Sequence, residues 1–358
     1  MFMLFFSSSI AQVNIFKADN SKIIYSGRVD KSVAGEATLI GSASTVSFRF
    51  AGDSCTVYLR NDTWDGLQNY VVFELDGEYL GRQRIDSVGI LPYPLKVKNN
   101  NSIHTVKVIK ATEAQNGYLT FAGITCRELL DAPPAREKAI EFIGNSITCG
   151  QGIESETIPC NSDQWYDQHN AYLAYGPIVA RKLGVDYMLS SVSGIGIYRT
   201  WNDTGSSMPM VYENLFLNTD SSRKWDFKQF KPDIVSICLG TNDLSDGDGK
   251  KERLPFDKEL FASKYIRFVQ TVFNHYPDAK IVLLNSPMIS GDKNKALIQS
   301  LKSVIHHFSK TRYKPVELFE FVRMEPQGCD YHPGKTDHQK MANQLYPFYK
   351  KILNNIIR

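Results

Sequence analysis

The hydrophobic periodicity of this sequence changes across residues 131–138, and its two sides predict different kinds of structure. Before the change, over residues 13–130, apolar and polar residues alternate at period two, as they do in half-buried β-strands. Within residues 131–138, Pro133 and Pro134 stiffen the chain and remove two N–H donors, which is typical of a linker. We therefore predict two domains, which suits a chain of 358 residues.

The N-terminal half predicts an antiparallel β-sandwich of the jelly-roll type. Asp76-Gly77 follows the apolar run 71–75, and this dipeptide is a strong signal for the turn of a β-hairpin. Short predicted strands at regular spacing favour a sandwich. Besides 71–75, they lie at residues 45–50, 55–60, 105–110 and 119–124.

The C-terminal half, residues 139–358, predicts a parallel sheet covered by helices on both faces, in a flavodoxin-like three-layer αβα arrangement. Predicted strands at residues 139–144, 185–190, 233–239, 280–284 and 317–321 alternate with predicted helices at residues 171–183, 258–275, 294–310 and 336–357. In such sheets ligands bind at the carboxyl ends of the strands. We therefore expect the functional residues in the loops that follow Ile143, Ser190, Leu239 and Phe321.

The first two of these loops offer a nucleophile and an oxyanion donor. Ser146 lies in a glycine-flanked turn, where a serine can present its hydroxyl at the sheet edge beside backbone N–H groups. Phosphate cradles and plain turns have the same pattern. In the second loop, Gly194 lets a backbone N–H approach a ligand closely, and a tight turn without a ligand is the alternative.

The other two loops offer an amide donor and a base. The Asn242 amide can complete an oxyanion hole without competing as a base. His332, just before the last predicted helix, can take the proton of Ser146 and later protonate the leaving alcohol. Asp330 is the candidate third member of a triad, which holds the imidazole.

The four candidates follow one another along the chain in the order Ser, Gly, Asn, His, each in a loop after a predicted strand. This arrangement resembles that of the SGNH (GDSL-like) hydrolase superfamily. More narrowly, a β-sandwich in front of residues 142–150 (FIGNSITCG) resembles carbohydrate esterase family 2. The run 103–114, with Gly117 and Phe121 beyond it, is similar to the sandwich domain of that family. The resemblance covers nearly the whole chain.

This resemblance implies hydrolysis of O-acetyl esters on sugars or polysaccharides, often at primary hydroxyls such as O6 of hexoses. It implies that Ser146 is the nucleophile, that His332 is the base, and that the oxyanion hole consists of Ser146, Gly194 and Asn242. No cofactor is expected. Two alternatives stay open: an esterase or lipase that acts on a non-carbohydrate ester, and a carbohydrate-binding protein with a silent hydrolase domain.

The sequence departs from the family pattern at two positions. Asn145 stands where the serine block usually has aspartate, and we expect altered local hydrogen bonds rather than lost chemistry. The superfamily also places an aspartate three residues before the histidine, where this chain has Cys329. Asp330 lies two residues before His332 and is still predicted as the triad acid, with a backbone carbonyl as the alternative.

Aromatic side chains near these loops are candidates for substrate contacts, because sugar faces stack on them. Tyr331 is the first candidate, and Trp201 and Trp165 follow. For each of them, packing in the core is the alternative.

The charge composition of the chain narrows the kinds of molecule that we expect it to bind. The net charge is +3, from 41 basic and 38 acidic residues, and no basic stripe is present, so we expect a neutral or weakly charged substrate and no nucleic acid. The family resemblance implies that this substrate is an acetylated oligo- or polysaccharide. The Asp246–Gly249 run resembles a calcium loop, but Lys250 and Lys251 occupy later ligand positions, so no metal is expected.

The first twelve residues resemble the remnant of a secretory signal peptide, although they lack a positive n-region. The apolar run is too short to span a bilayer, so a secreted or periplasmic protein without membrane insertion is expected. A plain apolar terminus is the alternative. Of the six cysteines, Cys149 and Cys160 are candidates for a bridge across a loop, and Cys238 is expected to be a free buried thiol.

Overall fold

In its described residues, the first domain is an antiparallel β structure of ten strands. The computed structural model describes residues 14–63, 66–86, 88–97, 103–161, 164–311 and 313–356, so the predicted signal-peptide remnant at residues 1–12 lies outside the described residues. The ten strands are β1 (Asn14–Lys17), β2 (Ile24–Ser26), β3 (Val29–Asp30), β4 (Ala37–Leu39), β5 (Thr45–Asp62), β6 (Asn69–Leu75), β7 (Glu78–Ile85), β8 (Leu91–Lys96), β9 (His104–Lys110) and β10 (Tyr118–Leu130).

The long strand β5 organises this domain, since it pairs with β2, β8, β9 and β10. The main path of hydrogen-bonded strands runs β3-β4-β10-β5-β9-β6-β7. Alternate side chains of β5, such as Phe48, Phe50, Val57 and Leu59, are fully buried. The period-two pattern of the sequence therefore marks the inner face, as expected for strands with one face in the core.

The second domain is a parallel five-stranded sheet in the order β12-β11-β13-β14-β15. Its strands are β11 (Ala139–Gly144), β12 (Asp186–Ser191), β13 (Ile234–Cys238), β14 (Lys280–Leu284) and β15 (Glu317–Phe319). In chain order this is 2-1-3-4-5, the flavodoxin-like arrangement. The predicted fold class is confirmed. Residues 131–138, between β10 and β11, contain no helix or strand.

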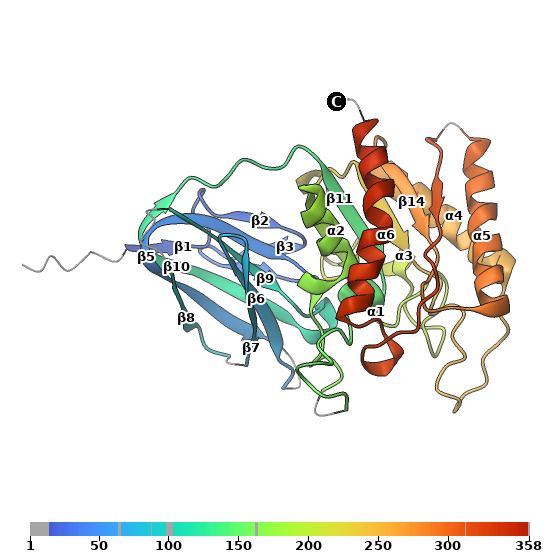
Figure 1. Cartoon of the computed structure of the whole chain (residues 1–358), viewed down its shortest axis with the longest axis horizontal. Coiled ribbons are helices and arrows are strands. Elements are labelled where there is room, and N and C mark those ends of the chain that lie inside the picture. Colours follow the sequence, from blue (N-terminus) through green and yellow to red (C-terminus); the bar gives the residue numbers. More distant parts are fainter. Residues whose placement is uncertain are drawn as a thin grey trace, which may run out of the picture.

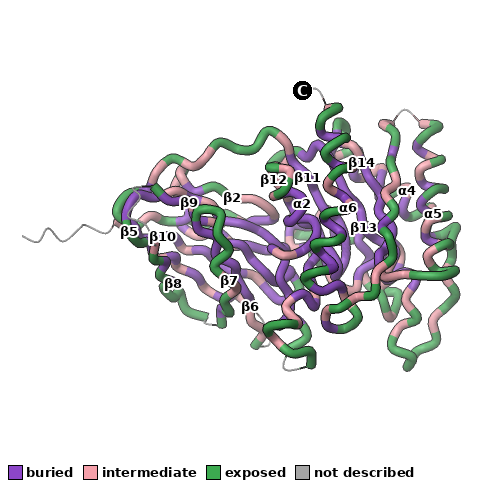
Figure 2. Tube along the Cα trace, viewed as in Figure 1, coloured by how far each residue is buried: buried purple, intermediate pink, exposed green. Residues whose placement is uncertain are grey.

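Helices cover both faces of the parallel sheet (Figure 1). Side chains of α4 (Lys258–His275) and α5 (Gly291–Ser309) share one buried cluster with Val235, Ile237 and Leu283 of the sheet. Side chains of α2 (Tyr175–Leu183) and α6 (Lys335–Asn354) share another with Ile234 and Val282. Successive residues of one strand thus enter opposite cores, which is why the strands read as continuous apolar runs. Figure 2 shows these strands as buried.

Shorter helices complete the domain: α1 (Ser146–Cys149), α3 (Met208–Val211) and the 3₁₀ turns η2 (Ala171–Leu173), η3 (Phe227–Gln229) and η4 (Cys329–Tyr331), while η1 (Ala114–Asn116) lies in the first domain between β9 and β10. The predicted helix 171–183 is divided here. It begins as η2, and the α-helix starts at Tyr175 with Pro177 in its first turn, where a missing N–H costs nothing.

A buried network of hydrogen bonds joins the two domains, which lie side by side in Figure 1. The Arg28 guanidinium, fully buried, comes from the first domain and donates to the backbone carbonyls of Tyr212 and Asn214 in the second. It also donates to Ser190 Oγ, which in turn donates to the Glu141 carboxylate at 2.6 Å. A buried charge left without partners would be costly, so these contacts hold the domains in a fixed arrangement.

Candidate active site

The nucleophile candidate Ser146 is the first residue of α1, directly after β11. Asn145 precedes it as the N-cap, and its side-chain oxygen accepts a hydrogen bond from the N–H of Ile147 at 3.1 Å. Asn145 thus keeps the acceptor that an aspartate would offer. Its amide nitrogen is buried and has no hydrogen-bond partner within the described part of the chain. Asparagine in place of aspartate at position 145 therefore alters the local hydrogen bonds, but the turn still forms.

The parallel register brings three of the predicted loops to the same edge. Gly144, the last residue of β11, pairs with Ser191 at the end of β12 and with Cys238 at the end of β13. The segments that carry Ser146, Gly194 and Asn242 therefore start side by side, although more than 90 residues separate the first from the last.

His332 lies beside Ser146 and has the tautomer that a general base needs. Its Nε2 is 2.8 Å from Ser146 Oγ, and its Nδ1 is 2.8 Å from the backbone carbonyl oxygen of Asp330. A carbonyl only accepts, so Nδ1 carries the proton and Nε2 is free to accept from the serine hydroxyl. Ser146 itself is only 6% exposed, whereas His332 is half-buried.

The predicted contact of His332 with the Asp330 carboxylate is not what the structure shows, because the backbone carbonyl takes that place. The reason is local. Asp330 and Tyr331 both have left-handed backbones, with φ of 54° and 58°, inside the 3₁₀ turn η4. This tight turn folds the Asp330 carbonyl back onto the imidazole two residues later, whereas the prediction assumed an extended strand. Asp330 is exposed.

Burial lowers the pKa of His332 below that of a free histidine, and the carbonyl and charge of Asp330 oppose this shift. We expect the acid limb of the kcat/KM profile to have its midpoint below pH 6.5. Asp330→Asn removes the charge but keeps the carbonyl, so the midpoint should move to still lower pH. At neutral pH, kcat should stay within about a factor of three, against the ~10⁴-fold loss typical when a triad aspartate becomes asparagine. A loss of kcat of that larger size would show that the Asp330 carboxylate acts as the triad acid.

The candidate oxyanion side is built from the Gly194 and Asn242 loops. Gly194 has a φ of 76°, and a Cβ there would meet the Trp201 ring at 2.9 Å, so both conformation and space require glycine. The Asn242 Nδ2 donates one hydrogen to the Ile195 carbonyl at 2.8 Å. An amide nitrogen has two hydrogens. The second remains for a ligand oxygen.

Asp243, next to Asn242, holds the Gly194 loop from behind. Its buried carboxylate accepts hydrogen bonds from the N–H groups of Ile197 and Tyr198 at 2.9–3.0 Å. Burial raises the pKa of Asp243 to about 6, and these N–H donors counteract the rise. The residue therefore has the turn-holding role expected from its type and position.

A cleft of about 920 Å³ connects the predicted site residues. Its lining includes Ser146, Gly194, Asn242, Asp330, Tyr331, His332, Trp165 and Trp201. The three aromatic side chains are well exposed, Tyr331 at 86%, so the structure places them on the cleft wall and not in the core.

The cleft is also lined by residues that are not among the sequence candidates. Four of them follow the predicted strand β14: Met288, Ile289, Ser290 and Lys293. The strand-end rule would have found this loop. Gln115 comes from the first domain, and no sequence signal indicates it.

The predicted bridge between Cys149 and Cys160 is wrong. Cys160 pairs with Cys329, 169 residues away, and ties the loop after α1 to the turn that carries His332. Cys149 is a free buried thiol whose Sγ lies 3.2 Å from Ser191 Oγ. The sequence separation suggested a short loop, but α1 directs Cys149 into the core. Cys238 is free and buried, as expected.

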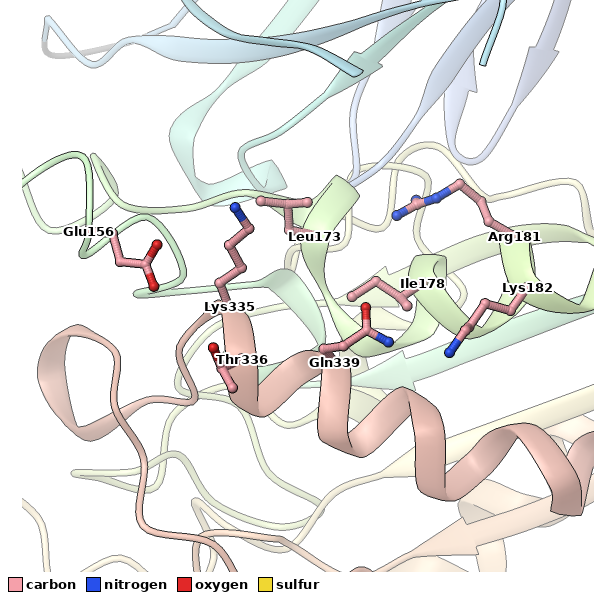
Figure 3. Close-up of a pocket in the computed structure, with 8 residues that line it drawn as sticks. All are labelled: Glu156, Leu173, Ile178, Arg181, Lys182, Lys335, Thr336 and Gln339. Carbon is pink, nitrogen blue, oxygen red and sulfur yellow. The ribbon is translucent and has the colours of Figure 1, made fainter. Parts of the chain in front are cut away.

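A second hollow, of about 690 Å³, lies between α2 and α6 and contains none of the candidate catalytic side chains (Figure 3). Among the described residues, no cluster of histidine, cysteine and acidic side chains could hold a metal ion. No helix within the described ranges has the length and apolar character needed to span a membrane.

Comparisons with known proteins agree with this geometry. Residues 142–335 match the GDSL-like lipase/acylhydrolase family. The chain belongs to that family. Residues 25–133 match the N-terminal domain of carbohydrate esterase family 2, so the family-2 resemblance is confirmed, and the chain is a carboxylic-ester hydrolase.

Individual relatives match most of the length of this esterase. An acetylxylan esterase / glucomannan deacetylase of Cellvibrio japonicus is 28% identical over 83% of this chain and 80% of that protein. Cellulase/esterase CelE of Acetivibrio thermocellus is 30% identical over 91% of this chain but only 39% of that longer protein. A family 2 carbohydrate esterase from Clostridium thermocellum, solved with cellohexaose, has a TM-score of 0.82, 28% identity, and coverage of 93% of this chain and 99% of that one.

Proposed function

We propose that this esterase removes acetyl groups from acetylated oligo- or polysaccharides. The observation that carries the proposal is the 2.8 Å contact between His332 Nε2 and Ser146 Oγ at the floor of an aromatic-walled cleft. Relatives named acetylxylan esterase / glucomannan deacetylase support an acetyl group on a sugar as the substrate. Trp165, Trp201 and Tyr331 offer faces on which sugar rings can stack.

The proposed reaction is a two-step acyl transfer. Ser146 Oγ attacks the acetyl carbonyl carbon while His332 Nε2 takes its proton, and the tetrahedral oxyanion forms. The N–H groups of Ser146 and Gly194 and the free hydrogen of Asn242 Nδ2 stabilise that negative charge. The C–O bond to the sugar then breaks, and His332 protonates the sugar oxygen. Water, deprotonated by His332, releases acetate by the same route and restores Ser146.

In place of a carboxylate, the Asp330 carbonyl holds the imidazole during this cycle. It fixes the Nδ1–H tautomer and accepts a stronger hydrogen bond once the ring is charged. The low pKa of His332 keeps the ring neutral, and thus competent as a base, below the pH at which a free histidine becomes protonated. We also propose that the protein is exported, because a disulfide such as Cys160–Cys329 persists in oxidising compartments.

The test measures acetate released from acetylated xylan and glucomannan by wild type and by Ser146→Ala. Wild-type turnover that disappears in the variant supports the proposal. Faster hydrolysis of long-chain aryl esters than of acetyl esters would favour a lipase-like activity instead. Glycan binding by both proteins without any acetate release would favour a silent hydrolase domain.

A further inference from the structure

The first domain reaches into the cleft of the second through the turn η1 (Ala114–Asn116). Ala114 is buried in the same apolar cluster as side chains of α4 and α5. The turn therefore packs into the core of the second domain. Its next residue, Gln115, lines the cleft together with Ser146 and Gly194. A residue of the β domain therefore stands at the candidate catalytic site.

Gln115 donates a hydrogen bond from its side-chain nitrogen to the backbone carbonyl oxygen of Ser193 at 2.9 Å. That carbonyl belongs to the peptide unit whose N–H is the N–H of Gly194. Because a trans peptide is planar, with C=O and N–H pointing in opposite directions, fixing the carbonyl also fixes the direction of the N–H. A hydrogen bond to the carbonyl polarises the amide as well, which makes its N–H a stronger donor.

The peptide unit that ends with the N–H of Ser193 is held by Glu113, the residue directly before η1. The Glu113 carboxylate, fully buried, accepts the N–H of Ser193 at 2.7 Å. It also lies 3.6 Å from Sγ of Cys149, on the helix that begins with Ser146. Two residues of the first domain thus hold Ser193 at both its N–H and its C=O, immediately before Gly194.

We propose that Gln115 is a positioning residue of the esterase: it aims and polarises the Ser193–Gly194 peptide so that the Gly194 N–H receives the oxyanion. The β domain then contributes to the chemical step itself through one hydrogen bond. This inference rests on the proposed acyl transfer at Ser146. A contact of Gln115 with the sugar is the competing role, and it predicts different kinetics.

Gln115→Met removes the donor and keeps the length of the side chain, and Gln115 is exposed, so folding should not change. We expect kcat to fall about 10–100-fold, less than the 10²–10³-fold typical for removing an oxyanion donor outright. The rate constants kcat and kcat/KM should fall together, because the contact acts in the transition state. The loss should be the same for 4-nitrophenyl acetate, which has no sugar, as for an acetylated oligosaccharide.

Gln299→Met, on the exposed face of α5, is the matched control and should keep wild-type rates. Inhibition by methylboronic acid, which forms a tetrahedral adduct with a serine, should weaken in Gln115→Met but not in the control. Thermal unfolding of all three proteins checks that they are folded.

Two other outcomes overturn the positioning proposal, and a third overturns the proposed function. A loss confined to the oligosaccharide makes Gln115 a sugar contact and ends the positioning proposal. Unchanged rates on both substrates end it as well. A wild type that hydrolyses neither substrate, like Ser146→Ala, contradicts the proposed function itself.

Discussion

Replacing Ser146 by alanine is expected to lower kcat on acetylated xylan by at least ~10⁴-fold, and replacing His332 by alanine by a comparable factor. The serine supplies the attacking oxygen, and only His332 Nε2 lies in place to take its proton within the described residues, at 2.8 Å. Each replacement therefore removes acyl transfer as a whole. The rate that remains reflects the oxyanion donors and substrate binding alone.

The double variant Ser146→Ala/His332→Ala should be scarcely slower than either single variant, because residues that act as one unit have non-additive effects. Acetate release under saturating substrate measures all three. His306→Ala, at an exposed position of α5, is the matched control and should keep the wild-type rate. Independent, multiplying losses in the double variant would show that the two residues do not act together.

Removing the Cys160–Cys329 disulfide is expected to lower the free energy of unfolding by about 2–5 kcal/mol. The bond closes a loop with a sequence separation of 169 residues and so restricts the unfolded chain strongly. In the folded protein it joins the segment after α1 to the turn η4, which ends directly before His332. The Cys160→Ser/Cys329→Ser variant, compared with wild type in urea unfolding, measures the effect.

At room temperature we expect the Cys160→Ser/Cys329→Ser variant to keep most of its kcat, although its free energy of unfolding is lower. The Cys329 N–H still donates to the Gly152 carbonyl, and the Gly328 N–H to the His332 carbonyl, so two backbone hydrogen bonds hold the turn without the disulfide. Dithiothreitol provides the control, since it should destabilise wild type but not the double-serine variant. An equal response of both proteins to the reductant would assign the effect to something other than this bond.

Much of the fold follows from neighbouring residues in the sequence. The helix predicted over residues 258–275 and the strands predicted over 139–144 and 280–284 have those bounds in the structure. Their periodicity and end residues lie within one segment, so no distant contact is needed to recognise them. The strand-end rule also selected the loops of Ser146, Gly194, Asn242 and His332, and the structure brings them into one cleft. Their catalytic roles remain predictions.

The partners of these residues depend on packing between distant segments. The sequence left two candidates for the group that holds His332, and the left-handed turn at Asp330 decided for the carbonyl. It suggested Cys149 as the partner of Cys160, whereas the fold of the loops brought Cys329 to Cys160.

The sequence alone therefore determined the two kinds of domain, their order and the residue types at the strand ends, because local periodicity and turn chemistry encode them. Only the tertiary structure decided the orientation of His332, the disulfide, and the entry of Gln115 from the other domain into the cleft. The disulfide and the Gln115 contact join segments 169 and 78 residues apart, and the orientation of His332 depends on the left-handed φ angles of Asp330 and Tyr331. Neither kind of feature leaves a repeating pattern in the sequence.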